Sequence, residues 1–157
     1  MAYPVPARPP ARGRTDVFGV IPLLLLPVLA YNLLALAWFG GVNAVGGELR
    51  LDATLFSITM TSGGIWAVSL SDLMLTVSLV ILFIELLKST TSRRVAIINH
   101  ALSMALFIGC LVELLLLGAF ATSTYFLITL MVLLDVLAGF IVTIVSARRD
   151  FGISDDS

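Results

Sequence analysis

The chain is poor in the residues that most often carry chemistry. It has one cysteine and one histidine in 157 residues, and Lys88 is its one lysine. Because Cys110 is alone, an intrachain disulfide and dithiol redox chemistry within this chain are excluded. A lone His100 cannot build a site that needs two histidines. Lys88 stands at the edge of an apolar run, which argues against a buried retinal Schiff base.

Charge and nucleotide-binding motifs are scarce as well. Charged residues make up 12% of the chain and the net charge is −1, so no bulk electrostatic signal points to nucleic acid. The sequence contains no G-x-x-x-x-G-K-[ST] run and no H-E-x-x-H. No pattern identifies a nucleophile with its base. We therefore predict no enzymatic activity, no cofactor and no bound metal.

Apolar residues are what the chain has in abundance. They form 59% of it, and the mean hydropathy is +1.09. A soluble domain of this size could not hide so much apolar surface, whereas runs of about 20 apolar residues match a hydrocarbon core of roughly 30 Å. We predict an all-α membrane protein, a four-transmembrane-helix bundle with a short β segment in the first outer loop. The expected parts are a disordered cytoplasmic tail at 1–16, spans at about 17–39, 68–87, 95–118 and 125–147, an outer loop at 40–66 and a cytoplasmic tail at 148–157.

The first apolar run contains Pro22 and Pro27. Proline kinks a helix, and membrane helices tolerate this better than soluble ones do. A cleavable signal peptide is the alternative, since arginines precede the run and Ala35-Leu36-Ala37 resembles a cleavage site. The run is longer than the roughly 7–15 residues of a signal-peptide core. We therefore expect a retained helix.

The segment from 40 to 66 has a different pattern. "ELRLDATL" and "FSITMT" alternate apolar and polar residues, which is typical of half-buried strands. Gly63-Gly64 can end the second run, and Trp66 stands where an interfacial aromatic is expected. We expect one or two short strands that lie over the outer ends of the helices.

Basic residues predict the orientation. Under a four-span arrangement only Arg50 falls on the outer side. The eight others fall on the inner side: Arg8, Arg12, Arg14, Lys88, Arg93, Arg94, Arg148 and Arg149. This asymmetry follows the positive-inside rule. We expect both termini in the cytoplasm and, for a bacterial source, a multi-pass location in the inner membrane.

Five ionisable residues lie within the expected spans: Asp72, Glu85, His100, Glu113 and Asp135. At 1.5 Å of rise per residue, Asp72 and Glu113 share an outer level, Asp135 lies alone near the middle, and Glu85 and His100 share an inner level. A direct Glu85–His100 contact is therefore plausible. Intramembrane acids often mark proton or ion paths. The favoured interpretation is structural, a buried polar network across helix seams.

Small residues recur at four-residue spacing on the last two spans. Such spacing lets helix backbones approach closely. We expect packing seams that hold the carboxylates away from lipid and point Asp135 into the bundle. The seam residues are Ala101, Ala105 and Gly109 before Glu113, and Gly139 and Thr143 after Asp135.

Two resemblances follow from these patterns. The expected four helices, with a long first outer loop and "GGIW" at 63–66, loosely resemble the layout of claudin-type tetraspan proteins. The stretch from "SDLMLTVSLVILFIELLKST" through "NHALSMALFIG" to "FATSTYFLITLMVLLDVLAGF" resembles small uncharacterised four-span proteins of bacterial inner membranes. That second resemblance covers roughly residues 64–145 and implies no activity.

The sequence thus favours a non-enzymatic subunit with a structural or assembly role in a homo-oligomer or a larger membrane complex. Its partners would be membrane lipids and either copies of itself or other membrane subunits, not nucleic acid. A proton- or cation-conducting channel or transporter subunit is one alternative. A lipid or quinone binder is another.

Overall fold

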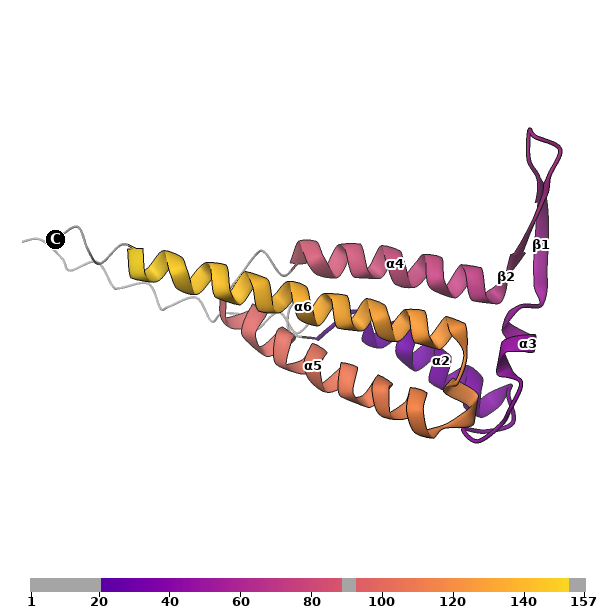
Figure 1. The fold of residues 1–157 in the computed structure, drawn as a ribbon, viewed down its shortest axis with the longest axis horizontal. Coiled ribbons are helices and arrows are strands. Elements are labelled where there is room, and N and C mark those ends of the chain that lie inside the picture. The colour runs from indigo at the N-terminus through magenta and orange to yellow at the C-terminus, as the bar shows by residue number, and fades with distance from the viewer. Residues whose placement is uncertain (1–20, 89–92, 153–157) are drawn as a thin grey trace, which may run out of the picture.

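The protein is mainly helical, as a computed structural model of residues 21–88 and 93–152 shows (Figure 1). The first half of this part has two helices and two strands: α2 (Leu25–Ala37), α3 (Gly47–Leu51), β1 (Thr54–Thr59) and β2 (Ile65–Ser69). The second half has three long helices and one 3-10 turn: α4 (Leu70–Lys88), α5 (Arg93–Leu116), η1 (Gly118–Phe120) and α6 (Ser123–Gly152).

Among the described residues, three helical stretches are long and apolar enough to cross a membrane: Leu70–Lys88, Ile97–Leu116 and Ser123–Ile141. They correspond to the last three expected spans. Helix α6 continues past the expected end at residue 147 to Gly152. Helix α2 has 13 residues, about 20 Å at 1.5 Å per residue, which is shorter than a hydrocarbon core. The expected start of the first span and the expected tail at 1–16 lie outside the described residues.

Helix α6 is the central element of the bundle. It packs against both α4 and α5, and α2 contacts α4 and α6; Figure 1 shows α4 and α5 on opposite sides of α6. Three aromatic rings pack together where α2 meets the start of α6. They belong to Tyr31, Phe120 and Tyr125, and all three side chains are fully buried. The Tyr31 ring centroid lies 4.6 Å from that of Tyr125 and 5.5 Å from that of Phe120.

The segment from 21 to 42 joins the two ends of this bundle. At the C-terminal end of α4, the Lys88 end, the Lys88 Nζ donates to the Ile21 carbonyl at 2.7 Å. At the opposite end, where α6 begins, the Ala119 amide donates to the Val42 carbonyl at 3.1 Å. We call this second end the hairpin end. The segment therefore extends over the same distance as α4, although only part of it is α-helical.

Strands β1 and β2 form an antiparallel hairpin. Gly63 lies in its turn with a φ of 83°, a left-handed value that suits glycine. The expectation of one or two short strands is confirmed, but β2 at Ile65–Ser69 lies after the two alternating runs in which the strands were expected. Their expected position is wrong, because the hairpin stands roughly perpendicular to the helices and projects past α4 instead of covering the helix ends (Figure 1).

One expected strand is also wrong in part. Residues 48–51 of "ELRLDATL" belong to the single helical turn α3, and only Thr54 and Leu55 belong to a strand. Leucine, glutamate and arginine are good helix formers. The turn also places Leu51 in the core, where its side chain is 0% exposed. Burial of one leucine therefore outweighs the alternating pattern.

Candidate functional site

The most extensive polar cluster surrounds Glu85, whose side chain is 0% exposed. Its Oε1 accepts hydrogen bonds from Asn99 Nδ2 at 2.6 Å and from Lys88 Nζ at 3.1 Å. Its Oε2 accepts a hydrogen bond from the Leu23 amide at 2.8 Å. We call Ile21, Leu23, Glu85, Lys88 and Asn99 the Glu85 cluster.

The Glu85 cluster connects three segments of the chain. Glu85 and Lys88 come from α4, Asn99 comes from α5, and Leu23 precedes α2. The Leu23 amide lies two residues before α2, so this hydrogen bond fixes the turn that leads into the helix. The Lys88 ammonium and two neutral donors, the Asn99 amide and the Leu23 backbone amide, offset the free-energy cost of burying the Glu85 carboxylate.

The expected Glu85–His100 contact is wrong, because Asn99 takes that place. Successive residues of a helix point about 100° apart, so the residue before His100 faces α4 instead. Sequence reasoning missed Asn99. The signal that could have found it is the face that Asn99 shares with Ser103, four residues later.

Asp135 lies inside the bundle with an exposed fraction of 4%, which is the orientation expected from the sequence. Its Oδ2 accepts a hydrogen bond from Ser103 Oγ at 2.6 Å. Ser103, which sequence reasoning also missed, is 1% exposed. The pair ties α5 to α6 at mid-span.

His100 packs against Gly139 of α6. A Cβ atom at Gly139 would lie 2.5 Å from His100 Nδ1, so only glycine leaves room for this ring. The His100 Nδ1 atom is buried and has no hydrogen-bond partner among the described residues. Gly139 therefore makes room on α6 for the His100 side chain of α5.

A second polar cluster lies nearer the hairpin end and joins α2, α5 and α6. Tyr125 Oη donates a hydrogen bond to Glu113 Oε2, and Asn32 Nδ2 donates to the same oxygen at 3.3 Å. Tyr31 Oη lies 2.6 Å from Thr122 Oγ1 and donates to the Ala119 carbonyl at 3.1 Å. The two contacts of Glu113 join helices directly, and the two contacts of Tyr31 join α2 to the connection between α5 and α6.

Asp72 is separate from Glu113, although both lie toward the hairpin end. The Asp72 carboxylate accepts hydrogen bonds from the Ser69 amide at 2.9 Å and from Ser69 Oγ at 2.8 Å. The Asp72 amide donates back to Ser69 Oγ at 3.2 Å. This reciprocal pair is a capping box at the start of α4, which gives Asp72 a local role.

Apolar side chains lie between Asp135 and the second cluster. Asp135 and Tyr125 are ten residues apart on α6, about 15 Å. Ile128 and Val132 lie between them and are 0% exposed. The buried Thr129 hydroxyl donates to the Tyr125 carbonyl of its own helix at 2.9 Å. A proton relay along this face would need acceptors that Ile128 and Val132 do not supply.

The small-residue stripe on α5 does not form a seam with the described residues of the chain. Ala101 and Ala105 are exposed, and no heavy atom lies within 4 Å of a Cβ built on Gly109. The stripe faces away from the bundle, since the buried face of α5 is the one with Asn99 and Ser103. The side chain of Thr143, the remaining expected seam residue, lies outside the described part.

Within the described ranges, no group of three or more His, Cys, Asp or Glu side chains could hold a metal ion. Cys110 is a buried free cysteine. Comparison of the chain with protein-family models, curated proteins and solved structures found no match.

Proposed function

We propose that this protein is a four-span integral membrane protein with a structural or assembly role, as a subunit of a homo-oligomer or a larger membrane complex. The observation that carries the proposal is the Glu85 cluster. Its one carboxylate connects α4, α5 and the start of α2. The buried side chains of Glu85, Asn99, Ser103 and Asp135 join helices through hydrogen bonds, which suits a rigid scaffold.

The position of residues 21–42 supports a fourth span. The Ile21 carbonyl is bonded at the Lys88 end and the Val42 carbonyl at the hairpin end. Between them runs α2, whose outward side chains are apolar, including Leu26, Leu29, Leu33 and Leu36 at 49–66% exposed. A segment that reaches from end to end with leucines on its outer face suits a bilayer.

The basic residues set the proposed orientation. Lys88 and the residues after it belong to the positively charged side, so the Lys88 end faces the cytoplasm together with both termini. The hairpin end then faces outward. For a bacterial source this is a multi-pass protein of the inner membrane.

The outward stripe of α5 supports an assembly role. Ala101, Ala105 and Gly109 face away from their own bundle. Small residues at this spacing are typical of helices that pack closely against another membrane helix. The stripe is therefore the proposed contact with a second subunit.

Substitution on this stripe tests the proposal. Gly109→Leu should weaken the association at least tenfold, measured as the fraction of oligomer or complex in mild detergent. The matched control is Val77→Leu on the exposed face of α4, which should leave association unchanged. Equal association of Gly109→Leu and the wild type would contradict the proposed contact.

A second candidate is a proton- or cation-conducting subunit that uses Asp135. The buried Asp135 carboxylate at mid-span, which is 4% exposed, favours it. The test is proton flux into proteoliposomes with a pH-sensitive dye, with Asp135→Asn compared against Asp72→Asn. Loss of flux in Asp135→Asn alone would support conduction. Unchanged flux in that variant, or no flux in the wild type, would exclude it.

A further inference from the structure

The β1–β2 hairpin has one continuous apolar face. In the register Phe56 lies opposite Val68, and Ile58 lies opposite Trp66, so these four side chains share a face. Met60 extends it, because its amide bonds to the Gly64 carbonyl at 2.8 Å, two residues beyond Ile58. We call these five residues the hairpin apolar face.

The opposite face is more polar. It carries the hydroxyls of Ser57 and Thr59, with Ala67 and Ile65 as their cross-strand partners. No ionisable residue occurs between Asp52 and Asp72. This opposite face is mixed, because Ile65 is 74% exposed on it beside the two hydroxyls, and neither face of the hairpin carries a charge.

The hairpin apolar face is largely uncovered within the chain. Phe56 is 51% exposed, Ile58 43%, Met60 41% and Trp66 48%, whereas Val68 at the base is 6% exposed. An isolated two-stranded hairpin is marginally stable in water. A projecting hairpin with four exposed large apolar side chains on one face needs a surface to rest on.

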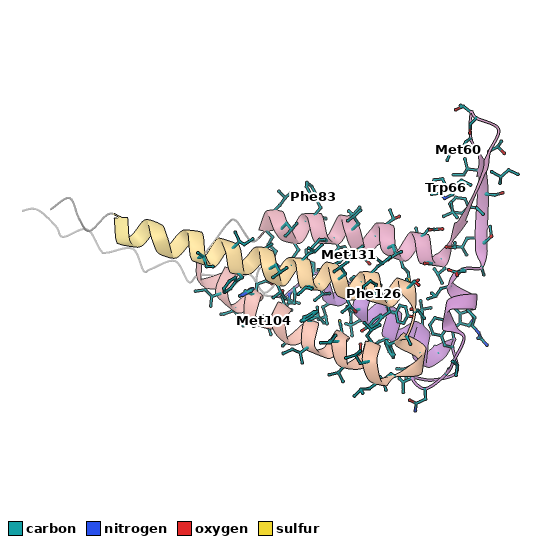
Figure 2. The ribbon with its side chains drawn as sticks, viewed as in Figure 1. Met60, Trp66, Phe83, Met104, Phe126 and Met131 are labelled. Atoms are coloured by element: carbon teal, nitrogen blue, oxygen red, sulfur yellow. The ribbon has the colours of Figure 1, made fainter. Side chains whose placement is uncertain are left out.

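The direction of the hairpin indicates that surface. Figure 2 shows Met60 and Trp66 on the side of the hairpin that faces back along α4. Phe83 of α4 points away from α6, on the side toward which the hairpin projects (Figure 2). The hairpin apolar face and the exposed face of α4, with Leu73, Val80 and Phe83 at 46–62% exposed, thus meet in a corner.

We infer that the hairpin apolar face rests on the phospholipid surface at the hairpin end of the spans. Because α4 is long and apolar enough to cross a membrane, lipid against its outer face lies directly beneath a hairpin that stands perpendicular to it. An open sheet edge cannot enter the hydrocarbon core, so the hairpin lies in the interfacial layer, where tryptophan is favoured. An uncharged face fits zwitterionic phospholipid.

Trp66 itself reports on this contact, since Trp38 is the other tryptophan of the chain. The Trp38→Phe variant is reconstituted in phosphatidylcholine vesicles with bromine near the carbonyl end or near the methyl end of the acyl chains. Trp66 fluorescence should be quenched at least twofold more by the shallow bromine than by the deep one. Aqueous iodide should quench it weakly.

The matched control places the reporter on the other face. Trp38→Phe/Trp66→Phe/Thr59→Trp puts one tryptophan on the hydroxyl face, and iodide should quench it at least threefold more than it quenches Trp66. The difference in fluorescence between the wild type and Trp66→Phe gives the signal of Trp66 without further substitutions. It keeps the test valid if a combined variant fails to fold.

Two results would overturn the inference. One is equal access of iodide to both faces. The other is a Trp66 that is protected from iodide and yet unquenched by brominated lipid, since a protein would then cover it. The inference rests on the proposed membrane placement but not on assembly. A monomeric protein with a lipid-quenched Trp66 would contradict only the assembly role.

Discussion

Glu85 shows how one buried side chain joins three segments of the chain. Its two oxygens accept hydrogen bonds from α4, α5 and the start of α2, and the side chain is inaccessible to solvent. The depth of Glu85 was predictable from its distance along the span. Its partners were not, because a one-residue rotation of α5 replaces His100 with Asn99. Depth follows from the sequence, whereas the facing residue depends on how the helices pack.

Glu85→Leu should destabilise the protein by about 3–5 kcal/mol, because it removes the carboxylate that accepts hydrogen bonds from the Lys88 ammonium and the Leu23 amide. Glu85→Gln should cost less, since it keeps an acceptor oxygen. The measurement is unfolding in mixed micelles with increasing dodecyl sulfate, followed by circular dichroism. The control is Leu79→Ala on the exposed side of α4, where Leu79 is 57% exposed. A loss in Glu85→Leu no larger than in this control would contradict the account.

Gly139→Ala should destabilise the bundle by about 1–3 kcal/mol, because the new methyl group would overlap His100 Nδ1 at 2.5 Å. His100→Ala in the same chain should recover much of that loss, which a double-mutant cycle measures. Gly109→Ala is the matched control. Its Cβ meets nothing within 4 Å, so the better helix propensity of alanine should stabilise it by up to about 1 kcal/mol. Equal effects at both glycines would exclude the proposed fit.

At the scale of elements, helices were predictable and short segments were less so. Runs of apolar residues identify α4, α5 and α6 because each helix must satisfy its own backbone in lipid. The α3 turn was not predictable from alternation, since the burial of Leu51 decides it. The small-residue stripe of α5 was correctly recognised as a pattern, but its direction depends on tertiary packing.

Asp72→Ala should destabilise the start of α4 by about 0.5–2 kcal/mol, because the capping box with Ser69 is lost. Asp72→Asn keeps an acceptor and should cost a smaller amount. Hydrogen exchange of the first-turn amides of α4 measures the effect locally. Protection that is unchanged in Asp72→Ala would show that neighbouring contacts, not the cap, hold this end.

At the scale of the whole molecule, three membrane-length helices agree with the sequence, and the fourth span is a proposal. The fourth span differs from the other three because the first apolar run of the chain contains prolines. Pro22 and Pro27 flank the start of α2, and the helix itself covers 13 residues. Hydropathy detects such a run, but it does not determine how much of it becomes helical.

Thiol labelling tests the fourth span. In a Cys110→Ser background, Val45→Cys should react with an impermeant reagent outside intact cells, since Val45 is 92% exposed near the hairpin end. Thr15→Cys should react only after the cells are permeabilised. Ser154→Cys should also react only then, because both termini are proposed to lie in the cytoplasm. Reaction of Thr15→Cys and Val45→Cys from the same side would remove the first span from the account.

The mass of the particle extracted from native membranes into lipid nanodiscs tests the central claim, a structural subunit of an assembly, most directly. The account predicts a protein mass at least twice the 16.8 kDa of one chain, made of several copies or of this chain with other membrane subunits. A single 16.8 kDa chain with no companion protein would contradict it.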